Sequence, residues 1–192
     1  MPDAGERGFL FRIRLLAGIC LACLLLAAWI AWRFVQAANG FPIWSLVFGT
    51  ATPADIAFLR DMLLLPERRE AAVLLFWLYA GPDLILPACL AALGLVSMRR
   101  LAPGGTLFGR PVSGGLLTAL LALPCIYVVA DYAENALSLA YFSTVAPPRP
   151  VMEHAPVLLP WLGSVKMAFF LVSALTIMRF WLLRRLGESD LG

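Results

Sequence analysis

The chain consists of long apolar segments separated by short polar ones. Four apolar runs stand out, at about residues 13–35, 71–98, 114–142 and 158–182. Each is long enough for a helix to cross a hydrocarbon core of about 30 Å, which takes roughly 20 residues. The pattern therefore predicts an all-α polytopic membrane protein, in which residues 1–192 form a single transmembrane domain built as a four-helix bundle.

The polar segment after the first run has a helical pattern of its own, at about residues 52–64. Thr52 is a candidate N-cap, and Pro53 suits the first helical position. Two faces then separate at helical spacing, an apolar one with Ile56, Leu59, Met62 and Leu63 and a charged one with Asp55, Arg60 and Asp61. We expect an amphipathic helix in the first outer loop, which either lies on the membrane surface, the interpretation that we prefer, or covers the mouth of the bundle as a lid.

The composition supports insertion into a membrane. Of the 192 residues, 61% are hydrophobic and 14% are charged, whereas soluble domains carry about 25% charged residues. The first run also resembles a secretory signal, because arginines precede it and "VQA" follows as a candidate cleavage site. We expect it to be retained, since it is too long for a signal and ends in "WIAWRF", whose aromatic and basic residues are typical of an interfacial anchor.

The arginines predict the orientation of the chain. One side of the membrane would hold those near both ends and between the second and third runs: Arg7, Arg12, Arg14, Arg99, Arg100, Arg110, Arg179, Arg184 and Arg185. By the positive-inside rule, we predict a multi-pass protein of the cell inner (plasma) membrane with cytoplasmic N- and C-termini. We therefore attribute the net charge of +3 to the arginines that set the orientation in the membrane. Because there is no basic tract, we expect the lipid bilayer as partner and no nucleic acid.

Neither the cysteines nor the histidine indicates a cofactor or metal site. The cysteines all lie in apolar surroundings, at Cys20, Cys23, Cys89 and Cys125. The spacing of the first two is that of a redox pair, but these surroundings lack the polar or electropositive groups that activate a thiol. His154 has Glu153 beside it and no further ligand at metal-binding spacing. We therefore expect inert cysteines, an exposed histidine, no metal and no cofactor.

Two loops are predicted to be irregular. The inner loop "RRLAPGGTLFGRPVSGG" is rich in glycine, proline and arginine and is typical of a flexible connector. The outer loop "VAPPRPVMEHAP" is rich in proline, which favours an extended conformation.

Four ionisable side chains lie inside the predicted spans. They are Asp83 in the second span, Asp131 and Glu134 in the third, and Lys166, the only lysine of the chain, in the fourth. At ~1.5 Å per residue, all four fall within about 8 Å of the predicted midplane, on its outer side. A charged side chain at the bilayer centre costs at least about 2.5–3.5 kcal/mol, so such residues persist where they face one another, a cavity or a ligand. We expect Lys166 to lie among the three acids, with a protonated carboxyl or a bound cation offsetting the excess negative charge.

Uncharged polar residues extend this predicted site along the helices. In the third span one helical face carries Tyr127, Asp131, Glu134, Ser138 and Tyr141, and Asn135 lies one turn from Asp131. In the second span Tyr79 precedes Asp83 by four residues and shares its face. Gly81 and Pro82 are expected to interrupt the helix and free backbone carbonyls beside Asp83.

This combination resembles a family of small four-span membrane proteins, mainly bacterial. The resemblance rests on "TPADIAFLRDML", on an aspartate followed by an apolar turn with proline, on "DYAEN" and on a lone lysine in the fourth span. It covers about two-thirds of the chain, from residue 50 onward. It implies the four-span architecture and marks Asp83, Asp131, Glu134, Asn135 and Lys166, but it implies no activity. The chain departs from the pattern in placing Gly81 and Pro82 directly before the aspartate.

Three functional hypotheses follow from these residues. The first, which we favour, is a protein that binds or translocates a proton, a cation or a small polar ligand at the buried polar cluster. The second is a structural intramembrane salt-bridge network in a scaffold or partner protein. The third is a membrane-embedded enzyme for an apolar or lipid substrate, with a carboxylate as acid and base. Small-residue runs such as "LAGICLAC" allow close helix contact within one chain or between copies, so the sequence leaves a homo-oligomer open.

Overall fold

The fold is almost entirely helical. The computed structural model describes residues 4–107, 109–143 and 145–189. In chain order the elements are α1 (Ala4–Ala37), α2 (Trp44–Val47), α3 (Pro53–Leu63), η1 (Pro66–Arg68), α4 (Arg69–Ala80), α5 (Pro82–Leu101), β1 (Thr106–Leu107), β2 (Arg110–Pro111), α6 (Gly114–Tyr141) and α7 (Arg149–Ser189).

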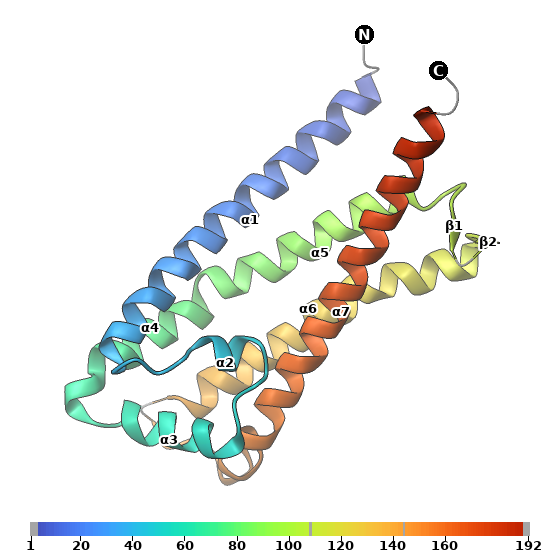
Figure 1. The fold of residues 1–192 in the computed structure, drawn as a ribbon. Helices are drawn as coiled ribbons and strands as arrows, with labels where there is room; N and C mark the ends of the chain where they lie inside the picture. The colour runs from blue at the N-terminus through green and yellow to red at the C-terminus, as the bar shows by residue number, and fades with distance from the viewer. Residues whose placement is uncertain (1–3, 108, 144, 190–192) are drawn as a thin grey trace.

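Four described segments are helical, long and apolar enough to cross a membrane: Gly8–Ala37, Pro66–Leu101, Gly114–Tyr141 and Arg149–Leu186. They confirm the four predicted apolar helices. The start of α1, the end of α7 and the β1–β2 ribbon gather at one end of the bundle, and α2 and α3 lie at the other (Figure 1). We call these the terminal end and the α3 end.

The second of these segments is broken, as predicted. Helix α4 ends at Ala80 and α5 begins at Pro82, with Gly81 between them at φ −110° and ψ −105°. The break follows from the sequence, because Pro82 has no backbone N–H and its ring crowds the preceding turn. It divides the second apolar segment into two shorter helices.

The outer loop that was predicted to be extended is helical from Arg149 onward. Helix α7 begins at Arg149, nine residues before the predicted span, and continues through Pro156 and Pro160. A proline inside a helix removes one backbone hydrogen bond, so propensity alone disfavours this outcome. Ala155 and Leu159 are buried in the core at 0% and 5% exposure. Packing of this apolar face outweighs the lost hydrogen bonds.

The inner loop contains regular structure as well. Strands β1 and β2 pair antiparallel, with Thr106 opposite Pro111 and Leu107 opposite Arg110. Ser113 then caps α6, because its hydroxyl accepts a hydrogen bond of 3.3 Å from the backbone N–H of Leu116. The predicted flexible connector is therefore partly a short ribbon.

Helix α3 forms where the sequence placed a helix. The Thr52 hydroxyl accepts from the Asp55 N–H at 3.2 Å, and the Asp55 carboxylate accepts from the Thr52 N–H at 2.9 Å. These bonds favour the ionised carboxylate and lower the pKa of Asp55. Ile56 and Leu59 are both fully buried, at 0% exposure. This face of α3 therefore packs on the bundle.

The turn before α3 approaches α7 at backbone distance. A Cβ atom added to Gly49 would lie 2.5 Å from the carbonyl oxygen of Pro160, and one added to Gly163 would lie 2.9 Å from the Cα of Gly49. Gly49 also has φ +66°, a conformation that other residues rarely adopt. The α2–α3 segment thus packs against α7 at Gly49 and Gly163. A larger residue at either position would force the two backbones apart.

We predict that Gly49→Ala destabilises the protein by about 1–3 kcal/mol more than Gly40→Ala. Gly40 is the matched control, because it also has positive φ, at +83°, but an added Cβ would meet nothing within 4 Å. The measurement is the free energy of unfolding of both variants in detergent micelles. Equal losses in the two variants would contradict the close approach of the α2–α3 segment to α7.

Candidate functional site

Two acids of α6 share one lysine of α7. The ammonium of Lys166 lies 2.7 Å from Oε2 of Glu134 and 3.2 Å from Oδ1 of Asp131. All three side chains are buried, at 5%, 2% and 3% exposure for Lys166, Glu134 and Asp131. Spacing of three residues places both carboxylates on the face of α6 that packs against α7. The predicted pairing across these two spans is confirmed.

The charges of this group do not balance. With every group ionised, two carboxylates face one ammonium and leave one negative charge in a buried site. Burying charges is costly, and mutual attraction repays the cost only when the partners compensate each other. Uptake of one positive charge, as a proton or a cation, would neutralise the group.

Asn135 connects the acids to the region of the break between α4 and α5. Its side-chain N–H₂ donates to the backbone carbonyl of Asp83 at 2.9 Å and to Oδ2 of Asp131 at 3.2 Å. In a regular helix the Asp83 carbonyl would accept from the residue four positions later, which is Pro87 and has no N–H. Asn135 thus satisfies a carbonyl that a proline leaves unbonded. We call Asp131, Glu134, Asn135 and Lys166 the charge cluster.

The side chain of Asp83 differs from our expectation. It is half-buried, and among the described residues it forms no salt bridge with Lys166. Its position explains this, because it lies in the first turn of α5, where the helix dipole and unbonded N–H groups stabilise a carboxylate. Asp83 is bonded to the charge cluster through its backbone carbonyl, and its carboxylate lies beyond salt-bridge distance from Lys166.

Tyr79 and Ser138 border the charge cluster toward the α3 end. Together with Glu134 they line a cavity of about 10 Å³, closed by apolar side chains that include Ile56 and Leu159. That is room for about one water molecule. The same two residues also line a groove of about 470 Å³ between α4 and α6. Tyr79 and Ser138 therefore stand between this groove and Glu134.

Oδ1 of Asn135 lacks a hydrogen-bond partner among the described residues, and Oγ of Ser138 has only the Tyr79 hydroxyl near it, outside strict hydrogen-bond geometry. Both residues are 1% exposed. Buried polar atoms are nearly always bonded, so each such atom needs an explanation. Both atoms can accept a hydrogen bond from a protonated group or from water.

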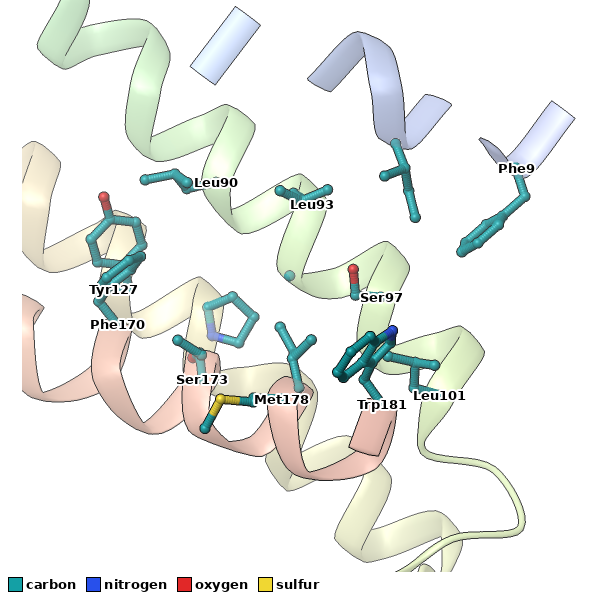
Figure 2. A pocket seen from close by; sticks show the side chains of 15 residues that line it. Phe9, Leu90, Leu93, Ser97, Leu101, Tyr127, Phe170, Ser173, Met178 and Trp181 are labelled. Carbon is teal, nitrogen blue, oxygen red and sulfur yellow. The ribbon is translucent and has the colours of Figure 1, made fainter. Parts of the chain in front are cut away.

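The two remaining predicted tyrosines lie on either side of this region. Tyr127 lines a large cavity in the terminal half of the bundle, and its ring packs on that of Phe170 with centroids 5.6 Å apart (Figure 2). Tyr141 lies two turns beyond Glu134, about 10 Å along the helix. The Arg60 guanidinium lies over its ring, 5.4 Å from the centroid. Tyr127 therefore borders the charge cluster, whereas Tyr141 belongs to the core at the α3 end.

Sequence reasoning missed the residues that close the site. Phe170 follows Lys166 by four positions, so its place on the same face of α7 was available from helical spacing. Gly49 and Gly163 carry no comparable signal, because their contact joins segments far apart in the chain. Cys20 and Cys23 are buried against Leu86, as expected for packing residues. His154 is exposed, as predicted.

We predict that Lys166→Met destabilises the protein by about 3–5 kcal/mol, because it leaves two buried acids without a counter-charge. Adding Glu134→Gln should restore part of this loss. Arg33→Met is the control, since it breaks the exposed Arg33–Glu70 pair, whose atoms are 2.6 Å apart, and should cost at most about 1 kcal/mol. The measurement is the free energy of unfolding in micelles. A double variant no more stable than Lys166→Met would contradict the pairing.

Comparisons with protein-family models, with curated proteins and with solved structures give no match for this chain. The resemblance to small four-span membrane proteins therefore stays a prediction. The function has to be inferred from the geometry alone.

Proposed function

We propose that the chain is an integral protein of the inner membrane that binds a proton at the charge cluster, reached from the outer side. The observation that carries the proposal is the sharing of Lys166 by two buried carboxylates, those of Asp131 and Glu134. One additional positive charge balances the three groups. Intramembrane acids that face a bundle interior are a recurrent element of proton relays.

The membrane location and orientation rest on the four apolar helices and on the arginines. Arg99, Arg100 and Arg110 lie between α5 and α6 or close to that loop, at the terminal end, and Arg184 and Arg185 lie near the end of α7. By the positive-inside rule the terminal end faces the cytoplasm. The α3 end then faces outward.

The size of the cavity beside Glu134 supports a proton over a larger ligand. About 10 Å³ holds roughly one water molecule and leaves no room for a metabolite. Oγ of Ser138 and Oδ1 of Asn135 can each accept a hydrogen bond from a protonated carboxyl or from that water. A small dehydrated cation remains the nearest competitor, because carboxylate, amide and hydroxyl oxygens also ligate cations.

A route to the site exists on the outer side. The groove between α4 and α6 reaches Tyr79 and Ser138, and their hydroxyl groups can each accept and donate a hydrogen bond. From there the polar face of α6 continues to Glu134 and Asp131. Toward the terminal end the rings of Tyr127 and Phe170 close this face, so passage across the membrane would require these rings to move.

The structural network is the second candidate function. It is favoured by the complete use of both Asn135 donors and by the short Lys166–Glu134 contact of 2.7 Å, which tie α5, α6 and α7 together. In that case the cluster would fix helix register and would exchange no proton in the physiological range. A pH titration of stability separates the two.

We predict that the folded protein loses stability as the pH rises from about 5 to about 9. The folded state would hold a proton that the unfolded chain has released, so removing that proton destabilises the fold. Glu134→Gln should flatten this dependence, because the amide cannot titrate. The measurement is the melting temperature in detergent buffer across this pH range.

Glu153→Gln is the matched control, since Glu153 is an exposed acid on α7 paired with Arg149, and it should behave as wild type. A flat profile in wild type would favour the structural network. If sodium or potassium ions stabilise the protein and Glu134→Gln abolishes this effect, the ligand of the charge cluster is a cation and not a proton. Proton flux into proteoliposomes would then show whether the bound ion also crosses the membrane.

A further inference from the structure

The terminal half of the bundle contains a large apolar cavity, partly open to its surroundings, that the proton site does not use. Its volume is about 680 Å³, within the range of about 300–1,000 Å³ typical of small-molecule sites. Helices α1, α5, α6 and α7 all contribute to its wall. Figure 2 shows it running from Tyr127 and Phe170 at one end to Phe9 and Trp181 at the other.

The lining of this cavity favours an apolar ligand. Most of its side chains are aliphatic or aromatic, and its hydroxyl groups are those of Ser97, Tyr127 and Ser173. The Ser173 hydroxyl already donates to the Phe169 carbonyl at 2.7 Å. The backbone also approaches closely here, since Gly94 has no side chain and an added Cβ would lie 3.4 Å from Cβ of Pro124. An apolar chain or ring is the chemistry that such walls accept.

The mouth of the cavity is basic. The guanidinium of Arg100 lies over the Phe9 ring, 5.1 Å from its centroid, and that of Arg185 lies over the Trp181 ring at 4.8 Å. Both rings line the cavity. These cation–π contacts hold two positive charges at the terminal end of an apolar chamber. Neither guanidinium has a salt bridge within the described part of the chain.

We propose that this cavity binds one acyl chain of an anionic phospholipid, whose phosphate group lies against Arg100 and Arg185. The apolar walls accommodate the chain, and the guanidinium groups provide the hydrogen-bond geometry that suits phosphate. The terminal end carries the excess of arginines, so the lipid belongs to the cytoplasmic leaflet, where anionic lipids attract basic groups. The inference stands independently of the proton site.

The positive charge at the mouth favours an anionic phospholipid over other molecules that could fill the cavity. A zwitterionic lipid would gain less from two guanidinium groups, because its headgroup carries no net charge. A soluble apolar molecule would gain nothing from them. A helix of a second copy would have to fill the chamber with its side chains, and its binding would be detected as a dimer.

The test is native mass spectrometry of the full chain in detergent with added phosphatidylglycerol or phosphatidylcholine of the same acyl chains. We expect one phosphatidylglycerol to be retained per chain and phosphatidylcholine to bind more weakly. The double variant Arg100→Gln, Arg185→Gln should weaken phosphatidylglycerol binding roughly tenfold or more. The control Arg14→Gln, Arg110→Gln removes the same net charge at exposed positions and should bind as wild type.

A second variant tests the chamber without touching the arginines. Ala174 lines the cavity, and Ala174→Trp should narrow it and weaken retention of the lipid. The melting temperature without lipid confirms that each variant is folded. Equal retention of both lipids, an equal loss in the control variant, or undiminished binding by folded Ala174→Trp would each overturn the proposal.

Discussion

The buried contact of Lys166 with Asp131 and Glu134 is the constraint on which the rest of the structure depends. Each of the three charges would be costly to bury alone, so α6 and α7 have to meet at the level where all three can compensate. This fixes the register of the two helices. It also fixes the face of α6 that points inward, and with it the positions of Asn135 and Ser138. One negative charge then stays unmatched, and this charge allows the site to take up a proton or a cation in addition to holding the helices together.

Prolines determine how the other helices adapt to this contact. Pro82 ends one half of the second span, and Pro87 leaves the carbonyl of Asp83 without its helical partner. That carbonyl is then bonded by Asn135 at 2.9 Å, so a defect in α5 becomes the link between α5 and the charge cluster. The proline thus leaves the Asp83 carbonyl available to accept a hydrogen bond from the buried side chain of Asn135.

The two halves of the bundle differ in character as a consequence. Toward the α3 end the interior is polar around Glu134, and the groove between α4 and α6 reaches Tyr79 and Ser138 beside it. The α2–α3 segment packs on α7 through Gly49. Toward the terminal end the interior widens into an apolar chamber with Arg100 and Arg185 at its mouth. Tyr127 lies between them, one turn from Asp131. A ligand in the chamber and a proton on the acids would thus be separated by the packed rings of Tyr127 and Phe170.

The sequence by itself determined the four apolar helices, the capped helix at 53–63, the break at Gly81 and the shared depth of the buried charges. These follow from helical period, chain geometry and the free-energy cost of charge in an apolar medium, all of which act locally. Only the tertiary structure decided that Lys166 pairs with two acids rather than three, that α7 continues through Pro156, and that a chamber forms in the terminal half. Those outcomes depend on how surfaces far apart in the chain pack against each other, and packing can outweigh both local propensity and the attraction of an unpaired charge.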